Sequence, residues 1–104
     1  MREVPERFLI FCERHPGLAA AYENLAAECR KAGPLGAKDQ ALAQLGVAVG
    51  AQVEGAVRSQ ARKALDTGLT PDEIRHAIML SLTTIGFPRM MLALTWAEDL
   101  LVEN

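Results

Sequence analysis

The sequence predicts an all-α fold of about six helices, in subunits that assemble into a homo-oligomer. Two observations lead to the fold class: Ala, Leu, Glu, Arg and Lys dominate the 104 residues, and strict alternation of apolar and polar residues is absent. A third observation leads to the assembly. Half of the residues are hydrophobic, whereas a chain of this length buries only about two thirds of its unfolded surface by itself. This excess predicts that subunits share a core.

Composition and charge exclude several classes of protein. The formal net charge is −2, and the five aromatic residues are not interleaved with Lys or Arg, so no nucleic-acid partner is expected. The first apolar run, Phe8 to Cys12, is too short for a secretory signal. The longest nearly apolar segment, Ala41 to Val53, is shorter than the roughly 20 residues of a membrane span. We therefore expect one cytoplasmic domain over residues 1–104, with no membrane partner.

The first helix is expected from about Pro5 to Arg14, because proline is accepted in a first turn and His15-Pro16-Gly17 forms a break. The second is expected from about Leu18 to Lys31 and stops at Gly33-Pro34. Its apolar residues recur at three- and four-residue steps. They are Leu18, Tyr22, Leu25 and Cys29.

The two cysteines, Cys12 and Cys29, lie outside any Cys-x-x-Cys spacing. In a chain without an export signal, this arrangement favours two core thiols over a disulfide or a redox pair.

The third helix is expected from about Ala37 to Gly50 and is apolar nearly all round after its first turn. This pattern predicts the central buried element of the fold. Gly46 and Gly50 lie four residues apart on it. Because glycine lowers helix propensity, the pair predicts close approach of a neighbouring backbone, and a hinge beside a site is the weaker alternative.

The fourth helix, in the stretch Ala51 to Thr70, has an uncharged amide on its apolar face. At about 100° per residue, Gln60 falls among five apolar side chains. These are Val53, Ala56, Val57, Ala61 and Ala64. A buried amide without partners costs about 1 to 3 kcal/mol, so Gln60 requires a polar neighbour, a water or a ligand. Glu54 stands in the first turn, where the helix dipole favours a carboxylate.

The last two helices have clear boundaries. Gly68 is expected to end the fourth helix, and Thr70-Pro71-Asp72-Glu73 forms a capping box with proline at the first helical position. The fifth helix then continues to about Thr84, and the sixth runs from about Pro88 to Val102. Both are apolar on more than one face, which implies burial against other subunits.

Residues with catalytic potential are few. The sequence has no phosphate-binding glycine loop, no nucleophile elbow and no metal-spaced set of His or Cys, so no cofactor and no metal are expected. His76 lies opposite the apolar face of the fifth helix, where a structural role at the surface or an interface is favoured over a catalytic one. The candidates for catalysis are Glu54, Gln60 and His76.

Several motifs occur in a specific order. They are Leu-x-x-Lys at 35–38, an apolar Ala/Val/Gly helix, Ala-Leu-Asp-Thr-Gly-Leu-Thr-Pro-Asp-Glu-Ile at 64–74 and Gly-Phe-Pro at 86–88. Over roughly residues 17 to 101 this order resembles the carboxymuconolactone decarboxylase family, which includes the alkylhydroperoxidase D-like proteins. The resemblance implies an all-α subunit in symmetric oligomers, commonly trimers or hexamers.

The resemblance also shows where this chain departs from the family. Redox members carry a Glu and then Cys-x-x-Cys-x-x-x-His, which together produce a reactive thiolate that attacks a peroxide. Counted back from Gly68, these four residues correspond to Ala41, Val53, Ala56 and Gln60. None matches, so the resemblance implies no peroxidase activity by the family's route. The decarboxylase branch also uses a histidine at the position of Gln60, so the same departure applies to that activity.

Two functions remain open. The first is a non-catalytic or sensory oligomer that binds a small apolar or aromatic molecule with one polar handle. Its pocket is lined by Ala41, Val53, Ala56 and Gln60. The second is an enzyme of altered chemistry, with Glu54 or a His76 from a neighbouring subunit as acid or base and Gln60 orienting the substrate. We favour the first. Redox chemistry by the two cysteines is a third reading, which requires both thiols to be reactive.

Overall fold

A computed structural model of the protein describes residues 4–102, and the regular elements in that range are all α-helices. The all-α prediction is confirmed. Contacts within the chain define two compact units, one that ends at Leu35 and one that begins at Gly36. The expectation of a single domain over residues 1–104 stays a prediction.

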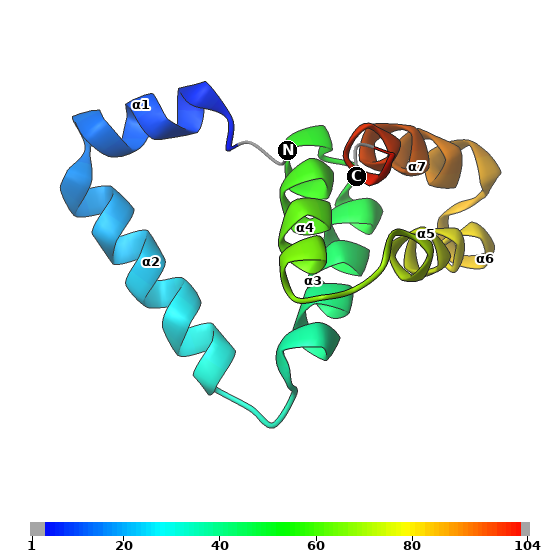
Figure 1. The fold of residues 1–104 in the computed structure, drawn as a ribbon, viewed down its shortest axis with the longest axis horizontal. Helices are drawn as coiled ribbons and strands as arrows, with labels where there is room; N and C mark the ends of the chain where they lie inside the picture. Colours follow the sequence, from blue (N-terminus) through cyan, green and yellow to red (C-terminus); the bar gives the residue numbers. More distant parts are fainter. Residues whose placement is uncertain (1–3, 103–104) are drawn as a thin grey trace. The chain divides into compact units, whose positions relative to one another are not determined.

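The N-terminal unit consists of α1 (Glu6–Arg14) and α2 (Pro16–Lys31). The chain turns sharply between them at His15 (Figure 1). The predicted break is therefore one residue long, because Pro16 and Gly17 are already helical. Proline is favoured in a first turn, where its missing N–H is not needed, and α2 starts two residues earlier than predicted.

Neither helix of this unit contains a buried residue. The apolar stripe predicted for α2 is present, but it faces solvent: Leu18, Tyr22 and Leu25 are each at least 60% exposed. The prediction of core thiols is wrong, since Cys29 is exposed and Cys12 only half-buried; both are free. Amphipathic periodicity identified the face correctly, and it carried no information on what covers that face.

The second unit begins with α3 (Ala37–Ala51) and α4 (Glu54–Asp66), which lie side by side (Figure 1). The corner between them is Gln52, a non-glycine residue in the left-handed region at φ 57°. Val53 is the N-cap of α4 rather than part of it. The boundary predicted between Gly50 and Ala51 is therefore displaced to Gln52.

The inner side of α3 is buried, as predicted for a central element, and its outer side is open. Val47 on the outer side is 73% exposed. A methyl group added at Gly46 or Gly50 would meet nothing within 4 Å. The prediction of close backbone approach at this glycine pair is therefore wrong within the chain.

The remaining elements are α5 (Pro71–Met79), α6 (Leu82–Ile85) and α7 (Phe87–Leu101). Gly68 ends α4 at φ 97°, and the Leu69 N–H donates to the Ala64 carbonyl, which completes the expected glycine-dependent stop. The fifth predicted helix is interrupted near Ser81, so it forms two elements. Gly86, at φ 92°, separates α6 from α7.

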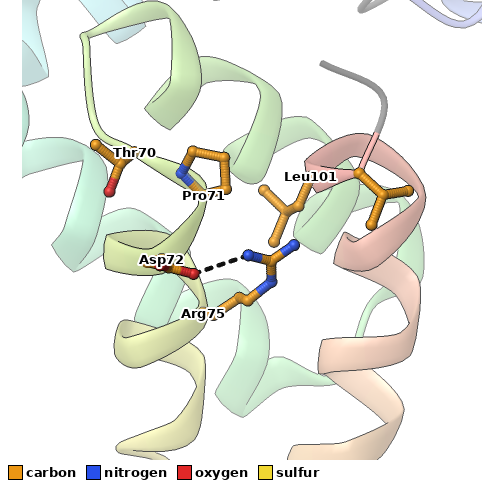
Figure 2. Close-up of a pocket in the computed structure, with 6 residues that line it drawn as sticks. Thr70, Pro71, Asp72, Arg75 and Leu101 are labelled. Atoms are coloured by element: carbon orange, nitrogen blue, oxygen red, sulfur yellow. Dashed lines mark hydrogen bonds and ion pairs between the residues drawn. The ribbon is translucent and has the colours of Figure 1, made fainter.

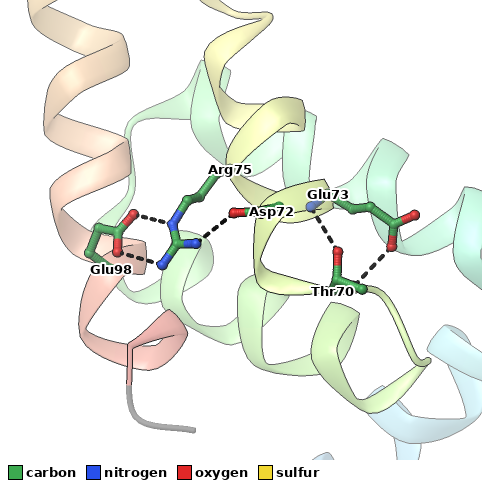
Figure 3. Close-up of polar contacts among 5 residues, drawn as sticks. All are labelled: Thr70, Asp72, Glu73, Arg75 and Glu98. Atoms are coloured by element: carbon green, nitrogen blue, oxygen red, sulfur yellow. Dashed lines mark hydrogen bonds and ion pairs between the residues drawn. The ribbon is translucent and has the colours of Figure 1, made fainter.

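The capping box that starts α5 is formed as predicted. The Thr70 hydroxyl accepts from the Glu73 N–H at 3.1 Å, and the Glu73 carboxylate accepts from the Thr70 N–H at 2.9 Å (Figure 3). Both bonds satisfy N–H groups that a helix start leaves without partners.

One apolar core unites the second unit, with contributions from α3, α4, α5 and α7 and from the Leu69 turn. Its largest fully enclosed side chains are Leu45, Ile74, Ile78, Val49 and Val57. Among the described residues, no polar or charged residue is buried as a whole. The core is therefore stabilised by apolar burial, and the polar contacts lie at its rim.

At that rim, consecutive residues of α7 bind two neighbouring helices. Glu98 accepts two hydrogen bonds from Arg75 of α5, at 2.7 and 3.1 Å, and Asp99 accepts one from Arg58 of α4 at 2.9 Å. Arg75 also donates to Asp72 at 2.9 Å (Figure 3). These contacts fix the positions of α4 and α5 along α7.

Candidate functional site

The candidate site lies on α4, on the side of the helix that presents Ala56 and Gln60. Val57, Ala61 and Ala64 form the buried face of α4. Gln60 is at the edge of that face, about 40° from Ala64 by helical geometry. It is half-buried, as is Ala56. The sequence placed Gln60 within the apolar stripe of its helix, whereas the structure places it at the edge of the buried face.

The Gln60 carbonyl oxygen, Oε1, is buried and has no hydrogen-bond partner. An amide oxygen accepts up to two hydrogen bonds, and leaving a buried acceptor unpaired costs about 1 to 3 kcal/mol. Such an atom requires an explanation, either a donor supplied from outside the chain or a function that offsets the cost.

The other predicted pocket residues differ in exposure. Ala41 is buried on α3 at 5% exposure, whereas Val53 is 53% exposed at the start of α4. Of the four predicted positions, Ala41 therefore lies in the core, Ala56 and Gln60 lie at its boundary, and Val53 lies at the surface. Whether they line one pocket stays a prediction.

Gln52 fixes the start of α4, and sequence reasoning gave it no role. Its side-chain Nε2 donates to the Val49 carbonyl at 3.0 Å and to the Arg89 carbonyl of α7 at 3.1 Å. These bonds hold the α3–α4 corner against α7 and place Val53 and the first turn of α4. No local sequence signal predicts a glutamine in the left-handed region, which favours glycine and asparagine.

Glu54 lies in the first turn of α4, as predicted, and forms an ion pair. Its carboxylate accepts from Arg58 Nε at 3.0 Å, one helical turn further on. Arg58 also donates to Asp99, and the two carboxylates raise the pKa of the guanidinium, Asp99 most strongly through its hydrogen bond. This arrangement is that of an exposed structural network, which disfavours Glu54 as a free general base.

His76 is exposed in the last turn of α5, on the side away from the buried Ile74 and Ile78. Whether this exposed position is free surface or an interface, the two locations expected from the sequence, stays a prediction. A basic residue in a last turn also complements the helix dipole, which gives His76 a structural reason to be there.

A separate cleft of about 390 Å³ lies where the start of α5 meets the end of α7. It is wide open, and Asp72 meets the Arg75 guanidinium inside it (Figure 2). Because Arg75 is also bound to Glu98, the cleft offers no uncommitted cation. Its lining residues are Thr70, Pro71, Asp72, Arg75, Leu101 and Val102. Sequence reasoning did not identify this cleft, because it depends on the meeting of two distant helices.

Within residues 4–102, no group of three or more His, Cys, Asp or Glu side chains has the arrangement to hold a metal ion. The described helices include none that is both long enough and apolar enough to cross a membrane.

Comparison with known families gives one result. The model of the carboxymuconolactone decarboxylase family matches residues 16–99. No curated protein and no solved structure matches the chain significantly. The family match covers most of the chain and includes α2 to α7 almost completely. The chain therefore belongs to the carboxymuconolactone decarboxylase family.

Proposed function

We propose that this protein is a member of its family that has lost the peroxidase relay and binds a small apolar or aromatic molecule beside Gln60. The functional form is a homo-oligomer, a trimer or a hexamer. The binding site takes in Ala41, Val53, Ala56 and Gln60, and the ligand carries one hydrogen-bond donor.

The observation that carries the proposal is the buried, unpaired Oε1 of Gln60. A carbonyl oxygen is an acceptor only, so the group that satisfies it is an O–H or N–H donor. The neighbouring positions Val53 and Ala56 are apolar and small to medium in size. An acceptor next to apolar side chains suits a molecule such as a phenol or an alcohol.

Loss of the relay is supported by the side chains at the matching positions. Val53 and Ala56 have no thiol to attack a peroxide, and an amide does not exchange protons as an imidazole does. Cys12 and Cys29 lie on α1 and α2, outside the motif. Redox chemistry by the family's route therefore has no nucleophile.

The alternative, an enzyme of altered chemistry, has weaker support. Glu54 is held by Arg58, and His76 is exposed at the far end of α5. If Glu54→Gln abolished an activity found in a substrate screen, the enzyme reading would replace ours. We expect the variant to be unchanged in every such assay.

The ligand test uses two probes, phenol and toluene, which share a ring and differ in the hydroxyl. We expect phenol to raise the melting temperature of the wild-type protein more than toluene does. In Gln60→Leu the two probes are expected to act equally, because the acceptor is gone. The matched control is Gln44→Leu, at an exposed glutamine of α3, which should retain the preference for phenol. Equal effects of phenol and toluene on the wild type would contradict the proposal.

The free protein provides a second readout of the same variant. Replacing an unpaired buried amide by an apolar group of similar shape is neutral or stabilising, by up to about 2 kcal/mol. We therefore expect Gln60→Leu to unfold at the same or a higher temperature than wild type. A strongly destabilised variant would mean that Gln60 makes structural hydrogen bonds.

The redox part of the proposal is tested by peroxide consumption with a dithiol reductant. The wild type is expected to match the buffer blank. Restoring the four family residues together, by Ala41→Glu, Val53→Cys, Ala56→Cys and Gln60→His, should create measurable consumption. Wild-type consumption that Cys12→Ser or Cys29→Ser removes would instead support the third reading of the sequence.

A further inference from the structure

The corner between α3 and α4 contains a strained residue. Among residues 4–102, Gln52 is the only residue other than glycine with a φ in the left-handed region. The other two positions with positive φ are Gly68 and Gly86, and glycine adopts such a conformation freely. A side chain in this region has a conformational cost, and such residues persist where surrounding contacts hold them, often at functional sites. Gln52 therefore requires a reason that glycine would not satisfy.

The reason lies in the side chain, because the turn itself needs only the backbone. The Gln52 N–H donates to the Ala48 and Val49 carbonyls at 3.0 and 3.1 Å, which ends α3, and glycine would form the same bonds. The side-chain amide adds a longer connection. Besides the Val49 carbonyl, its Nε2 reaches the Arg89 carbonyl in the first turn of α7, 37 residues further along the chain. One donor group thus joins the end of α3 to the start of α7 at the point where α4 begins.

The corner determines where α4 starts. Val53 follows Gln52 directly and is the N-cap of α4, and its carbonyl accepts from the Val57 N–H at 3.0 Å. No side chain caps this helix start, so its position depends on the residue before it. Ala56 lies in the same first turn. A displacement of Gln52 would therefore displace both apolar residues that α4 contributes to the proposed binding site.

A second contact joins the start of α4 to α7, and it is of a weaker kind. Arg58 donates to Asp99 at 2.9 Å, and the two side chains are 34 and 71% exposed. Exposed ion pairs contribute little to stability and are screened by salt. The Gln52 amide is uncharged, so salt does not screen its bonds in this way. Gln52 is therefore the more constant of the two connections.

We propose that Gln52 is a positioning residue for the ligand site beside Gln60. Its hydrogen bond to the Arg89 carbonyl holds the first turn of α4, so that Val53 and Ala56 form a fixed apolar wall next to the amide acceptor. The two glutamines then have separate roles. Gln60 accepts the donor of the ligand and sets the preference for a hydroxyl, whereas Gln52 sets the fit of the ring and thus the affinity for every ligand of that shape. This inference rests on the proposed function.

Two substitutions of Gln52 remove the side-chain hydrogen bonds and differ in their effect on the strain. Gln52→Gly relieves the strain, whereas Gln52→Met keeps a long unbranched side chain in the strained conformation. A merely structural role predicts that the two variants differ in stability and that each, once folded, binds ligands as the wild type does. A positioning role predicts that both bind more weakly. Titrations followed by NMR chemical shifts, at a temperature where each variant is folded, measure the Kd for phenol and for toluene.

We expect the Kd for phenol and the Kd for toluene to rise together in both variants, by about 3- to 10-fold, as for the loss of one hydrogen bond. The ratio of the two Kd values should stay that of the wild type. Gln60→Leu should show the opposite pattern, a ratio close to one, because it removes the acceptor and leaves the corner intact. The matched control is Thr95→Gly, at an exposed position of α7. It weakens a helix without touching the corner and should leave both Kd values unchanged.

The outcomes separate this inference from the proposed function. If the wild type prefers phenol and both Gln52 variants bind the two probes as the wild type does, the inference is wrong and the proposed function stands. If only Gln52→Met binds more weakly, the backbone turn positions the site, and the hydrogen bonds do not. A changed ratio in the Gln52 variants would mean that Gln52 contacts the hydroxyl itself, which would also overturn the positioning role. A wild type without a preference for phenol would overturn the proposed function and this inference with it.

Discussion

The two compact units have similar helical propensity and opposite burial. In the unit from Gly36 onwards, four helices enclose one apolar core. In the unit that ends at Leu35, α1 and α2 contain no buried residue. Helix formation therefore does not by itself produce a core, because an amphipathic face is stabilised only when a second surface removes it from water.

The larger unit fixes its elements with specific side chains, such as the capping box at Thr70, the Gln52 corner and the Arg75–Glu98 pair. Helices α1 and α2 start without a side-chain cap, as α3, α4 and α7 of the larger unit also do.

The largest expected effect tests this contrast directly, with two leucine truncations. Leu45→Ala removes a fully enclosed side chain and should lower the free energy of unfolding by about 2 to 5 kcal/mol at every protein concentration. Leu25→Ala, at an exposed position, should lower the free energy of unfolding by less than about 0.5 kcal/mol in dilute solution. Denaturant titrations of the two variants at two protein concentrations measure these changes in the free energy of unfolding. If Leu25→Ala lowered the free energy of unfolding in dilute solution as much as Leu45→Ala does, α2 would be buried within its own chain.

The second prediction concerns the Gln52 corner, where two variants separate hydrogen bonding from backbone conformation. Gln52→Ala and Gln52→Gly both lose the two side-chain hydrogen bonds, each contributing about 1 kcal/mol. Only glycine adopts φ 57° without strain, so Gln52→Gly should be about 1 kcal/mol more stable than Gln52→Ala. Equal stabilities in a denaturant titration would show that the left-handed conformation is not retained.

The third prediction concerns the capping box. Thr70→Ala removes the acceptor for the Glu73 N–H and should cost about 1 kcal/mol. For a domain of this size, that loss corresponds to a decrease of about 4 to 8 °C in melting temperature. Thr83→Ala, at an exposed threonine of α6, is the control and should be neutral. A neutral Thr70→Ala would mean that α5 is held by packing alone.

Predictions from the sequence succeeded where the signal is local. The stop at Gly68 and the start at Thr70 depend on residues within one turn of each other, so their chemistry is readable from the chain. The breaks at Gln52 and near Ser81 have no such signal. They result from contacts with α7 and from the packing of the core, which periodicity does not contain.

Part of the candidate site could be predicted from the sequence. Periodicity placed Gln60 within the apolar stripe of its helix, and the structure places it at the edge of the buried face. The missing partner of its oxygen depends on every atom around it, so it requires coordinates. The exposure of Cys29 was mispredicted for a related reason: a pattern identifies an apolar face without identifying the surface that covers it.

The smallest expected effect concerns the ion pair between α5 and α7. Arg75→Lys keeps the charge but loses one of the two parallel hydrogen bonds to Glu98. Because the Arg75 side chain is partly exposed to solvent, we expect a smaller decrease in melting temperature than for Thr70→Ala. The decrease should shrink in 1 M NaCl, where the Debye length is about 3 Å. Arg7→Lys, on α1, should have no effect and serves as the control from the other unit.

The pH dependence of this variant follows from the guanidinium. The hydrogen bonds to Glu98, followed by that to Asp72, raise the pKa of Arg75 above its ordinary value. A group with a raised pKa stabilises the fold at every pH below its unfolded pKa, and that contribution is lost only as the pH rises through the folded one. The guanidinium of Arg75 therefore stays charged throughout the range from pH 7 to pH 9, and lysine also remains charged at pH 9. The difference in melting temperature between wild type and Arg75→Lys should therefore be equal at pH 7 and pH 9. A difference that changed over this range would assign the stabilisation to another titrating group.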